Sequence, residues 1–405
     1  MRYTRPNQVC YRLAQVVCWF VAAFIFKRKI IRNEIKGKEG PFVIIANHQA
    51  AYDFVNLIGL NRRPMSFVIS SSFYHALPIR GFLDKLGVIP KQQFQTSVRD
   101  MKRMKAVIEQ GQPLVIYPAG LMCEDGLSTP IPAATYKFLK WLKADVYMAR
   151  TQGTYFAMPK WGKGLRPGRT YMDVYKLFDK EELAGMDVEE VRARTDEALL
   201  FDAYREQERL RVSYKGNSSL EGLEHVLYMC PHCLTEFSIK VKNGNTLSCS
   251  HCGFEQISDE YALLHNRKGV GREVRYVSDW SRFIYGKLRE KVERGVEDGM
   301  SVRTGIHMIP EGEKRFTQVG EGVLSLSRDG IRIDGQLHGE RAALEVPIGN
   351  IPTLPFSPGK YLEVQQGDTI YRCVLEDGRL TMKFINLVKI FYELNCAGDQ
   401  MVSCG

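Results

Sequence analysis

Apolar runs and helical stretches alternate over the first half of the chain. The clearest apolar runs are FVIIA at 42–46, SFVIS at 66–70 and PLVIYP at 113–118. Between the second and third runs, Ser97 and Asp100 resemble a capping box, and the helix that they open is expected to stop at Gly111. Strands that alternate with helices predict an α/β layer fold for this part of the chain.

The pattern becomes polar after this half and then helical. The run YKGNSSLEG at 214–222 has few apolar residues and is typical of a linker. Residues 273–298 place Trp280, Ile284 and Leu288 on one helical face, which predicts a connecting helix.

Short alternating strands dominate the last hundred residues. Turn pairs at Asp329-Gly330 and Gly367-Asp368 separate apolar runs, and a periodic apolar stretch at 382–394 follows them. We therefore expect a small, mostly-β C-terminal domain at 300–396 that is closed by a helix. At the level of pattern it resembles a pleckstrin-homology-like barrel.

The N-terminal segment combines apolar sequence with positive charge. Residues 1–60 hold nine basic side chains against three acidic ones, and the uncharged run LAQVVCWFVAAFIF at 13–26 ends at Lys27-Arg28-Lys29. As a helix this run spans roughly 21 Å, short of the roughly 30 Å hydrocarbon core. We expect residues 1–32 to form a helix that lies in the membrane interface on the cytoplasmic side. The alternative is a helix buried under the first domain.

Four cysteines form two C-x2-C pairs with fifteen residues between them. They are Cys230, Cys233, Cys249 and Cys252. This spacing predicts a structural Zn²⁺ site of four thiolates in a zinc ribbon at 223–265, and two disulfides are the alternative. The scattered remaining cysteines favour a reducing, cytoplasmic compartment. The segment carries charges of both signs without a basic stripe, so a protein partner fits the ribbon and the C-terminal domain better than nucleic acid.

The stretch ANHQAAYD at 46–53 follows the first strand directly. In one regular helix, His48 and Asp53 would lie roughly 140° apart around the axis and could not touch. They can pair if His48 lies in the turn after the strand and Asp53 lies in the first turn of a helix that Asn47 caps. The carboxylate would then orient the imidazole as a general base. The alternative is an ordinary polar loop.

Three motifs in order carry a family resemblance. The strand followed by N-H-x4-D, the strand that leads to G-V-I-P and the strand that ends in Y-P-x-G resemble the glycerolipid acyltransferase family, which includes the lysophosphatidate acyltransferases. The resemblance implies an α/β acyltransferase domain at 33–213, with a mixed sheet flanked by helices. It implies that His48 deprotonates a lysophospholipid hydroxyl, such as that of 1-acyl-glycerol-3-phosphate, which attacks an acyl-CoA or acyl carrier protein thioester. Asp53 would orient His48, and amides of a helix that begins near Asn47 would stabilise the oxyanion.

The later motifs depart from the family. Lys91, Gln92 and Gln93 stand where an arginine is usual, and YPAGLMC stands for F-P-E-G-T-R-S, so that Tyr117, Pro118 and Gly120 are retained. The substrate-binding residues that we expect are Asn47, Lys91, Tyr117 and Gly120.

Three alternatives stay open for the acceptor. In the first, a cation and a carboxylate near these motifs replace the lost side chains; the candidates are Lys91, Arg99, Lys102, Glu124 and Asp125. In the second, the acceptor has no phosphate at that place. In the third, the domain is an inactive, membrane-bound adaptor.

Overall fold

The computed structural model describes residues 5–94, 97–216, 219–310, 313, 315–367 and 369–402. Two compact units divide the chain. The first comprises Met1–Lys160, Gly164–Asn217 and Glu260–Ala262, and the second comprises Trp161–Lys163, Ser218–Asp259 and Leu263–Gly405. Asp368 of an expected turn, Asn217 and Ser218 of the expected linker, and the first four residues of the expected N-terminal helix lie outside the described residues.

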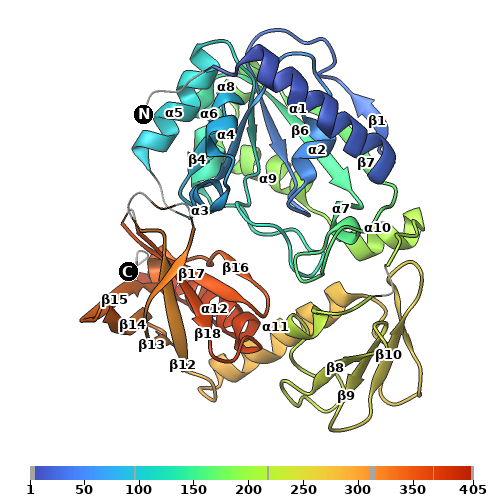
Figure 1. The fold of residues 1–405 in the computed structure, drawn as a ribbon, viewed down its shortest axis with the longest axis vertical. Coiled ribbons are helices and arrows are strands. Elements are labelled where there is room, and N and C mark those ends of the chain that lie inside the picture. Colours follow the sequence, from blue (N-terminus) through green and yellow to red (C-terminus); the bar gives the residue numbers. More distant parts are fainter. Residues whose placement is uncertain are drawn as a thin grey trace. The chain divides into compact units, whose positions relative to one another are not determined.

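The first unit is built on a seven-stranded sheet with the order β1-β7-β6-β2-β5-β3-β4 (Figure 1). Its strands are β1 (Lys29–Asn33), β2 (Phe42–Ala46), β3 (Ser66–Ser70), β4 (Ile89–Lys91), β5 (Leu114–Ile116), β6 (Asp145–Gln152) and β7 (Tyr171–Phe178). Strands β6, β2, β5, β3 and β4 are parallel neighbours, whereas β7 is antiparallel to β6. The expected mixed sheet is therefore confirmed, and the three apolar runs form β2, β3 and β5.

Helices surround this sheet. They are α1 (Gln8–Phe20), α2 (Asp53–Leu57), α3 (Ser71–Ala76), α4 (Arg80–Lys85), α5 (Val98–Glu109), α6 (Ala134–Leu142), α7 (Thr154–Ala157), α8 (Lys180–Gly185), α9 (Val188–Leu199) and α10 (Ala203–Leu210). The Ser97 side chain accepts a hydrogen bond from the Asp100 amide at the start of α5, as the sequence predicts. Gly111 follows that helix with a positive φ of 76°, a backbone conformation that favours glycine.

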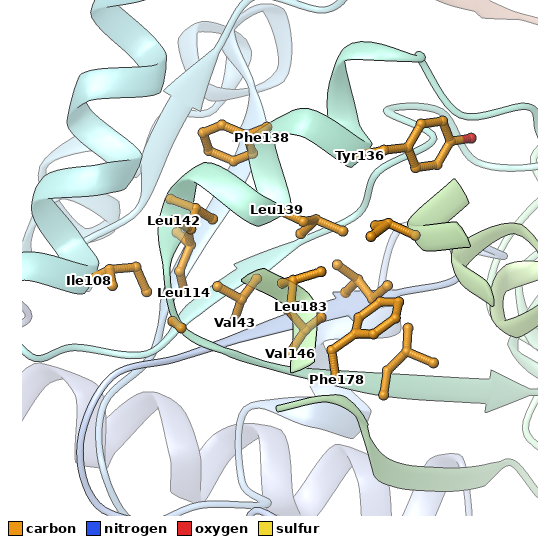
Figure 2. Close-up of a cluster of buried hydrophobic side chains, with 14 of the residues drawn as sticks. Val43, Ile108, Leu114, Tyr136, Phe138, Leu139, Leu142, Val146, Phe178 and Leu183 are labelled. Atoms are coloured by element: carbon orange, nitrogen blue, oxygen red, sulfur yellow. The ribbon is translucent and has the colours of Figure 1, made fainter. Parts of the chain in front are cut away.

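One face of the sheet carries the main core of the unit. Figure 2 shows Val43, Leu114 and Val146 of three strands meeting side chains of α5, α6 and α8. The helical side chains include Ile108, Leu139, Leu142 and Leu183. Strand β2 is buried along its whole length, which explains its unbroken apolar sequence. The loops at its carboxyl end therefore start from a rigid element.

The N-terminal helix is longer than its apolar run. It spans Gln8–Ile25, the last turn being a π-helix (Val21–Ile25), and it is long and apolar enough to cross a membrane by length and composition. One side packs on the unit through Tyr11, Ala14 and Ala22, and the Gln15 side chain donates hydrogen bonds to backbone carbonyls of the unit. The other side exposes large apolar side chains: Val9, Leu13, Val16, Val17, Trp19, Phe20 and Phe24.

The second unit begins with a small antiparallel sheet of order β11-β10-β9-β8. Its strands are β8 (Ile239–Lys242), β9 (Thr246–Cys249), β10 (Glu255–Ser258) and β11 (Leu264–Asn266), and a 3-10 turn (Leu223–His225) precedes them. Helix α11 (Val277–Glu293) follows, inside the range expected for a connecting helix.

A seven-stranded antiparallel sheet completes the second unit, in the order β15-β14-β13-β12-β18-β17-β16. Its strands are β12 (Gly299–Met308), β13 (Thr317–Ser327), β14 (Gly330–Leu337), β15 (Glu340–Pro347), β16 (Phe356–Ser357), β17 (Tyr361–Gln366) and β18 (Thr369–Leu375). A 3-10 turn (Ile348–Asn350) lies between β15 and β16, and α12 (Leu380–Val402) follows the last strand. The expected β-rich region that ends in a helix is present. Its likeness to a pleckstrin-homology barrel and the expected domain boundaries stay predictions.

Candidate active site and metal centre

The residues singled out in the first unit gather at one edge of its sheet. Strands β2, β5, β3 and β4 are successive parallel neighbours, so their carboxyl ends lie at the same edge. His48 follows β2 and Tyr117 follows β5, while Ser70 and Lys91 end β3 and β4. Ligands of open α/β sheets bind outside the carboxyl ends of the strands, which makes this edge the candidate active site.

His48 and Asp53 are in contact at this edge. The imidazole Nδ1 lies 2.9 Å from the Asp53 Oδ2, with His48 in the loop after β2 and Asp53 as the first residue of α2. This is the geometry expected from the sequence, in which the pair can meet only across the start of a helix.

The Asp53 carboxylate also holds the loop that carries His48. The same Oδ2 accepts hydrogen bonds from the Gln49 amide at 2.7 Å and the Ala50 amide at 3.0 Å, and the side chain is fully buried. Opposite this contact, the imidazole Nε2 makes no hydrogen bond within the described part of the chain, and 20% of the side chain is exposed. With its Nδ1 proton donated to Asp53, His48 can accept a proton at Nε2 from a bound hydroxyl.

Tyr117 stacks on the imidazole. The two ring centroids are 4.4 Å apart at an interplanar angle of 31°. The Tyr117 hydroxyl is buried and has no hydrogen-bond partner among the described residues. Burial raises the pKa of Tyr117 well above its ordinary value, and the charge of Asp53 raises it further, so this hydroxyl stays protonated. The sequence carried no signal for the stacking, because β2 and β5 are neighbours only in the folded sheet.

Asn47 does not cap a helix, and this expectation is wrong. Its side-chain amide donates to the Thr151 carbonyl and its Oδ1 accepts from the Thr151 amide, both at 2.8 Å, so it links β2 to β6. Helix α2 starts only at Asp53, after an N-cap residue, Tyr52, with no side-chain cap. Among the described residues after Asn47, the first helix begins at Asp53, so no helix N-terminus lies at Asn47 to donate to an oxyanion. A substrate-binding role for Asn47 stays a prediction.

The degraded motifs form a polar network beside Tyr117. The Gly120 amide donates to the Tyr117 carbonyl at 3.0 Å, and Gly120 has a positive φ of 68°, which the turn requires. The Gln93 side chain donates to the Gly120 carbonyl and accepts from the Ser70 hydroxyl at 2.9 Å. Sequence reasoning recorded Gln93 as a departure and missed this bridge between the loops after β4 and β5.

Lys91 is the cation that the structure holds at the end of β4. Its ammonium donates to the Gln92 carbonyl at 2.8 Å, and burial lowers its pKa although the charge of Asp100 opposes this. A partly desolvated ammonium gains more from an anionic ligand than a fully hydrated one does. Of the two carboxylates considered for the lost glutamate, Asp125 accepts from the Leu127 amide at 3.0 Å and so closes its own turn.

The four cysteines of the second unit converge on one point. Their Sγ atoms all lie within 4.8 Å of one another. Cys230 Sγ and Cys252 Sγ are 3.8 Å apart, and Cys233 Sγ and Cys249 Sγ are 3.7 Å apart. Sulfurs bound to one Zn²⁺ at about 2.3 Å in a tetrahedron lie about 3.8 Å from each other. The donor set therefore fits one four-coordinate metal ion.

Comparisons with known proteins match the part of the chain that contains the first site. Residues 27–162 match the acyltransferase family model. A curated relative, a 1-acyl-sn-glycerol-3-phosphate acyltransferase of Chlamydomonas reinhardtii, is 24% identical over 165 residues. The alignment covers 40% of this chain and 49% of the relative, about half its length.

Two solved structures are similar at low scores. The 1-acyl-sn-glycerophosphate acyltransferase PlsC of Thermotoga maritima has a TM-score of 0.41 and 16% identity, over 51% of this chain and 79% of that chain. The Ran-binding domain of Nup2 from Ashbya gossypii has a TM-score of 0.19 and 12% identity, over 23% of this chain and 94% of that chain. A TM-score below 0.5 does not establish a shared fold for either of them.

Proposed function

We propose, on the premise that residues 27–162 are a domain of the acyltransferase family, that the chain transfers a fatty acyl group from a thioester donor to the hydroxyl of a lysophospholipid. The observation that carries the proposal is the contact of His48 Nδ1 with Asp53 Oδ2 at 2.9 Å, at the carboxyl edge of the sheet. A lysophospholipid such as 1-acyl-glycerol-3-phosphate is the acceptor named for the curated relative.

The reaction needs one base and no covalent enzyme intermediate. His48 takes the proton of the acceptor hydroxyl at Nε2 while Asp53 accepts the Nδ1 proton in a hydrogen bond. The acceptor oxygen forms a bond to the thioester carbonyl carbon, and the carbon–sulfur bond then breaks. The imidazolium returns its proton to the leaving thiolate. The products are the acylated glycerolipid and the free thiol of CoA or of the carrier protein.

Lys91 is proposed to bind the acceptor's phosphate. Its ammonium is partly desolvated at the end of β4, where an incoming anion restores favourable interactions. In Lys91→Met the KM for 1-acyl-glycerol-3-phosphate should rise about tenfold, as expected for one lost charge-assisted hydrogen bond. In the control Lys85→Met, which alters an exposed lysine on α4, the KM should stay unchanged. An unchanged KM in Lys91→Met would assign phosphate binding to another group.

The membrane interface is the proposed location, on its cytoplasmic side. The N-terminal helix has one face packed on the first unit and an opposite face of exposed apolar side chains, and Lys27 and Lys29 follow it. In the middle of the helix, the Gln15 side chain donates hydrogen bonds to backbone carbonyls of the unit. Such a helix suits embedding along its exposed face better than crossing the bilayer.

The metal centre is proposed to hold Zn²⁺ in a structural role. Four thiolates fill its coordination sphere, so no position is left for a substrate. Metal analysis of the purified chain should find one zinc ion per chain, and a chain with Cys249→Ser should lose it. A wild-type chain free of metal after mild purification would refute the site.

The substrate panel tests the proposed reaction. Purified full-length protein is incubated with long-chain acyl-CoA or acyl carrier protein and with lysophospholipids of different headgroups, and acylated products are measured by mass spectrometry. We expect product with a phosphate-bearing acceptor, and a rate lower by about 10²-fold or more in His48→Ala. Absence of product with every pair, alongside normal liposome binding, would favour the membrane-bound adaptor.

A further inference from the structure

The metal-binding knuckles are in contact with both long helices of the second unit. Trp280 of α11 is fully buried, and its indole N–H donates to the Met229 carbonyl at 2.8 Å, one residue before Cys230. The same indole packs edge-on against Phe254, two residues after Cys252, with ring centroids 5.7 Å apart at 87°. One side chain of α11 thus touches the flanks of both knuckles.

A cluster of four charges extends the contact to α12. Glu236 lies three residues after Cys233 and accepts hydrogen bonds from Lys291 of α11 at 2.7 Å and from Lys383 of α12 at 3.0 Å. Lys383 also pairs with Glu297 at 2.8 Å. Lys383, Glu236 and Glu297 are mostly buried, and Lys291 is partly exposed. The stability of such buried ion pairs depends on every charged side chain in the cluster, because removal of one leaves another buried charge uncompensated.

Helix α11 is also joined directly to α12 and to the β-rich region. The Tyr285 hydroxyl donates to Glu393 of α12 at 2.9 Å, and Arg289 pairs with the same carboxylate at 2.5 Å. Arg328, in the turn between β13 and β14, donates to the Val292 carbonyl at 2.6 Å. The carboxyl end of α11 is thereby attached to the C-terminal sheet.

We infer that the four-cysteine metal centre holds together the whole C-terminal unit, because the loop of its first knuckle anchors α11 and α12 through Trp280 and Glu236. The metal fixes the conformation of residues 229–236. That conformation presents the Met229 carbonyl to Trp280 and the Glu236 carboxylate to Lys291 and Lys383. Loss of the metal should therefore loosen the β-rich region, whose strands lie far from the cysteines in sequence. This coupling rests on the proposed Zn²⁺ site and is independent of acyl transfer.

Hydrogen–deuterium exchange of the full-length chain tests this coupling. Zinc is removed with a chelator and then added back, and exchange is followed in peptides from β9, α11, β12, β17 and the first unit. After zinc is removed, we expect the exchange rates in β9, α11, β12 and β17 to rise together by about tenfold or more, as expected for one cooperative unit. The rates should return to their original values when zinc is added back. Exchange in β2 and β6 of the first unit should stay unchanged.

A substitution separates coupling from metal binding. In Glu236→Gln the side chain keeps its shape and loses its charge, so zinc content and protection of β9 should be retained while exchange in α12 and β17 rises. The control Glu340→Gln changes an exposed carboxylate of β15 and should leave all peptides as in the wild type. Exchange that rises only in β8–β11 after chelation, or Glu236→Gln behaving as the control, would overturn the inference.

Discussion

At the scale of single residues, one carboxylate oxygen positions both the His48 imidazole and the loop that carries it. Asp53 Oδ2 contacts the His48 imidazole and accepts two backbone amides of the same loop. The Asp53→Asn variant would keep the shape of the side chain but lose its negative charge. An asparagine that presents its NH₂ group to Nδ1 also favours the wrong imidazole tautomer.

We therefore expect Asp53→Asn to lower kcat by about 10²–10⁴-fold, the range of a general base that is lost or misprotonated. Steady-state acyl transfer measures kcat, and circular dichroism checks that the variant is folded. The matched control is Asp298→Asn, which removes an exposed carboxylate in the second unit and should leave kcat unchanged. An Asp53→Asn enzyme with full kcat would show that His48 needs no orienting acid.

The stacking of Tyr117 on His48 yields a second expectation. Tyr117→Phe keeps the ring and should keep kcat within about twofold, whereas Tyr117→Ala should lower it about tenfold, since a stacked aromatic pair contributes about 0.5–1.5 kcal/mol. The comparison of the two variants separates the ring from the hydroxyl. A Phe variant as impaired as the Ala variant would assign the role to the hydroxyl instead.

The sequence predicted the pairing of His48 with Asp53 because the two are only five residues apart, where spacing and helix geometry limit the possibilities. It did not predict the partners of Asn47 and Gln93. Asn47 bonds to Thr151, 104 residues away, and Gln93 bonds to Gly120 across a strand order that is not sequential. Local pattern contains no information on such contacts.

At the scale of elements, the N-terminal helix shows where hydropathy falls short. Its uncharged run begins at Leu13, but the helix begins at Gln8 with the Asn7 side chain as its N-cap. Polar Arg12 and Gln15 fit inside it because Gln15 donates to the Ile58 and Asn61 carbonyls of the first unit. The helix expected over residues 1–32 is too long at its carboxyl end, because residues 29–32 belong to strand β1 (Lys29–Asn33).

The exposed face of that helix predicts membrane binding. Phe24 is 67% exposed there, and Leu200, after α9 on the same unit, is 65% exposed. Phe24→Ser should weaken binding to anionic liposomes about tenfold, because burial of a Phe side chain contributes about 1.5–3 kcal/mol. Leu200→Ser, with a side chain of similar exposure, should bind as the wild type does. Liposome co-sedimentation compares the two, and equal losses would place the membrane contact elsewhere.

At the scale of the whole molecule, the order of the parts could be predicted from composition and pattern alone. The α/β region, the cysteine pairs and the β-rich end each have a distinct local signature. The contacts that join the parts of the second unit have no such local signature. Glu236 and Lys383 are 147 residues apart, and each is an unremarkable charge in its own stretch. The sequence therefore predicts the parts of the second unit and leaves open how they stabilise one another.

The adaptor alternative also belongs to this scale, since a membrane-bound chain can carry a family domain without turnover. The two accounts differ in a single quantity, the rate of acyl transfer by a correctly folded, membrane-bound protein. The most direct measurement compares wild-type protein with His48→Ala on the same liposomes that contain 1-acyl-glycerol-3-phosphate and a long-chain acyl thioester. We predict transfer by the wild type and a loss of at least about 10²-fold in His48→Ala with unchanged liposome binding. Transfer undiminished in His48→Ala, or no transfer by either protein, would contradict the assignment of His48 as the base.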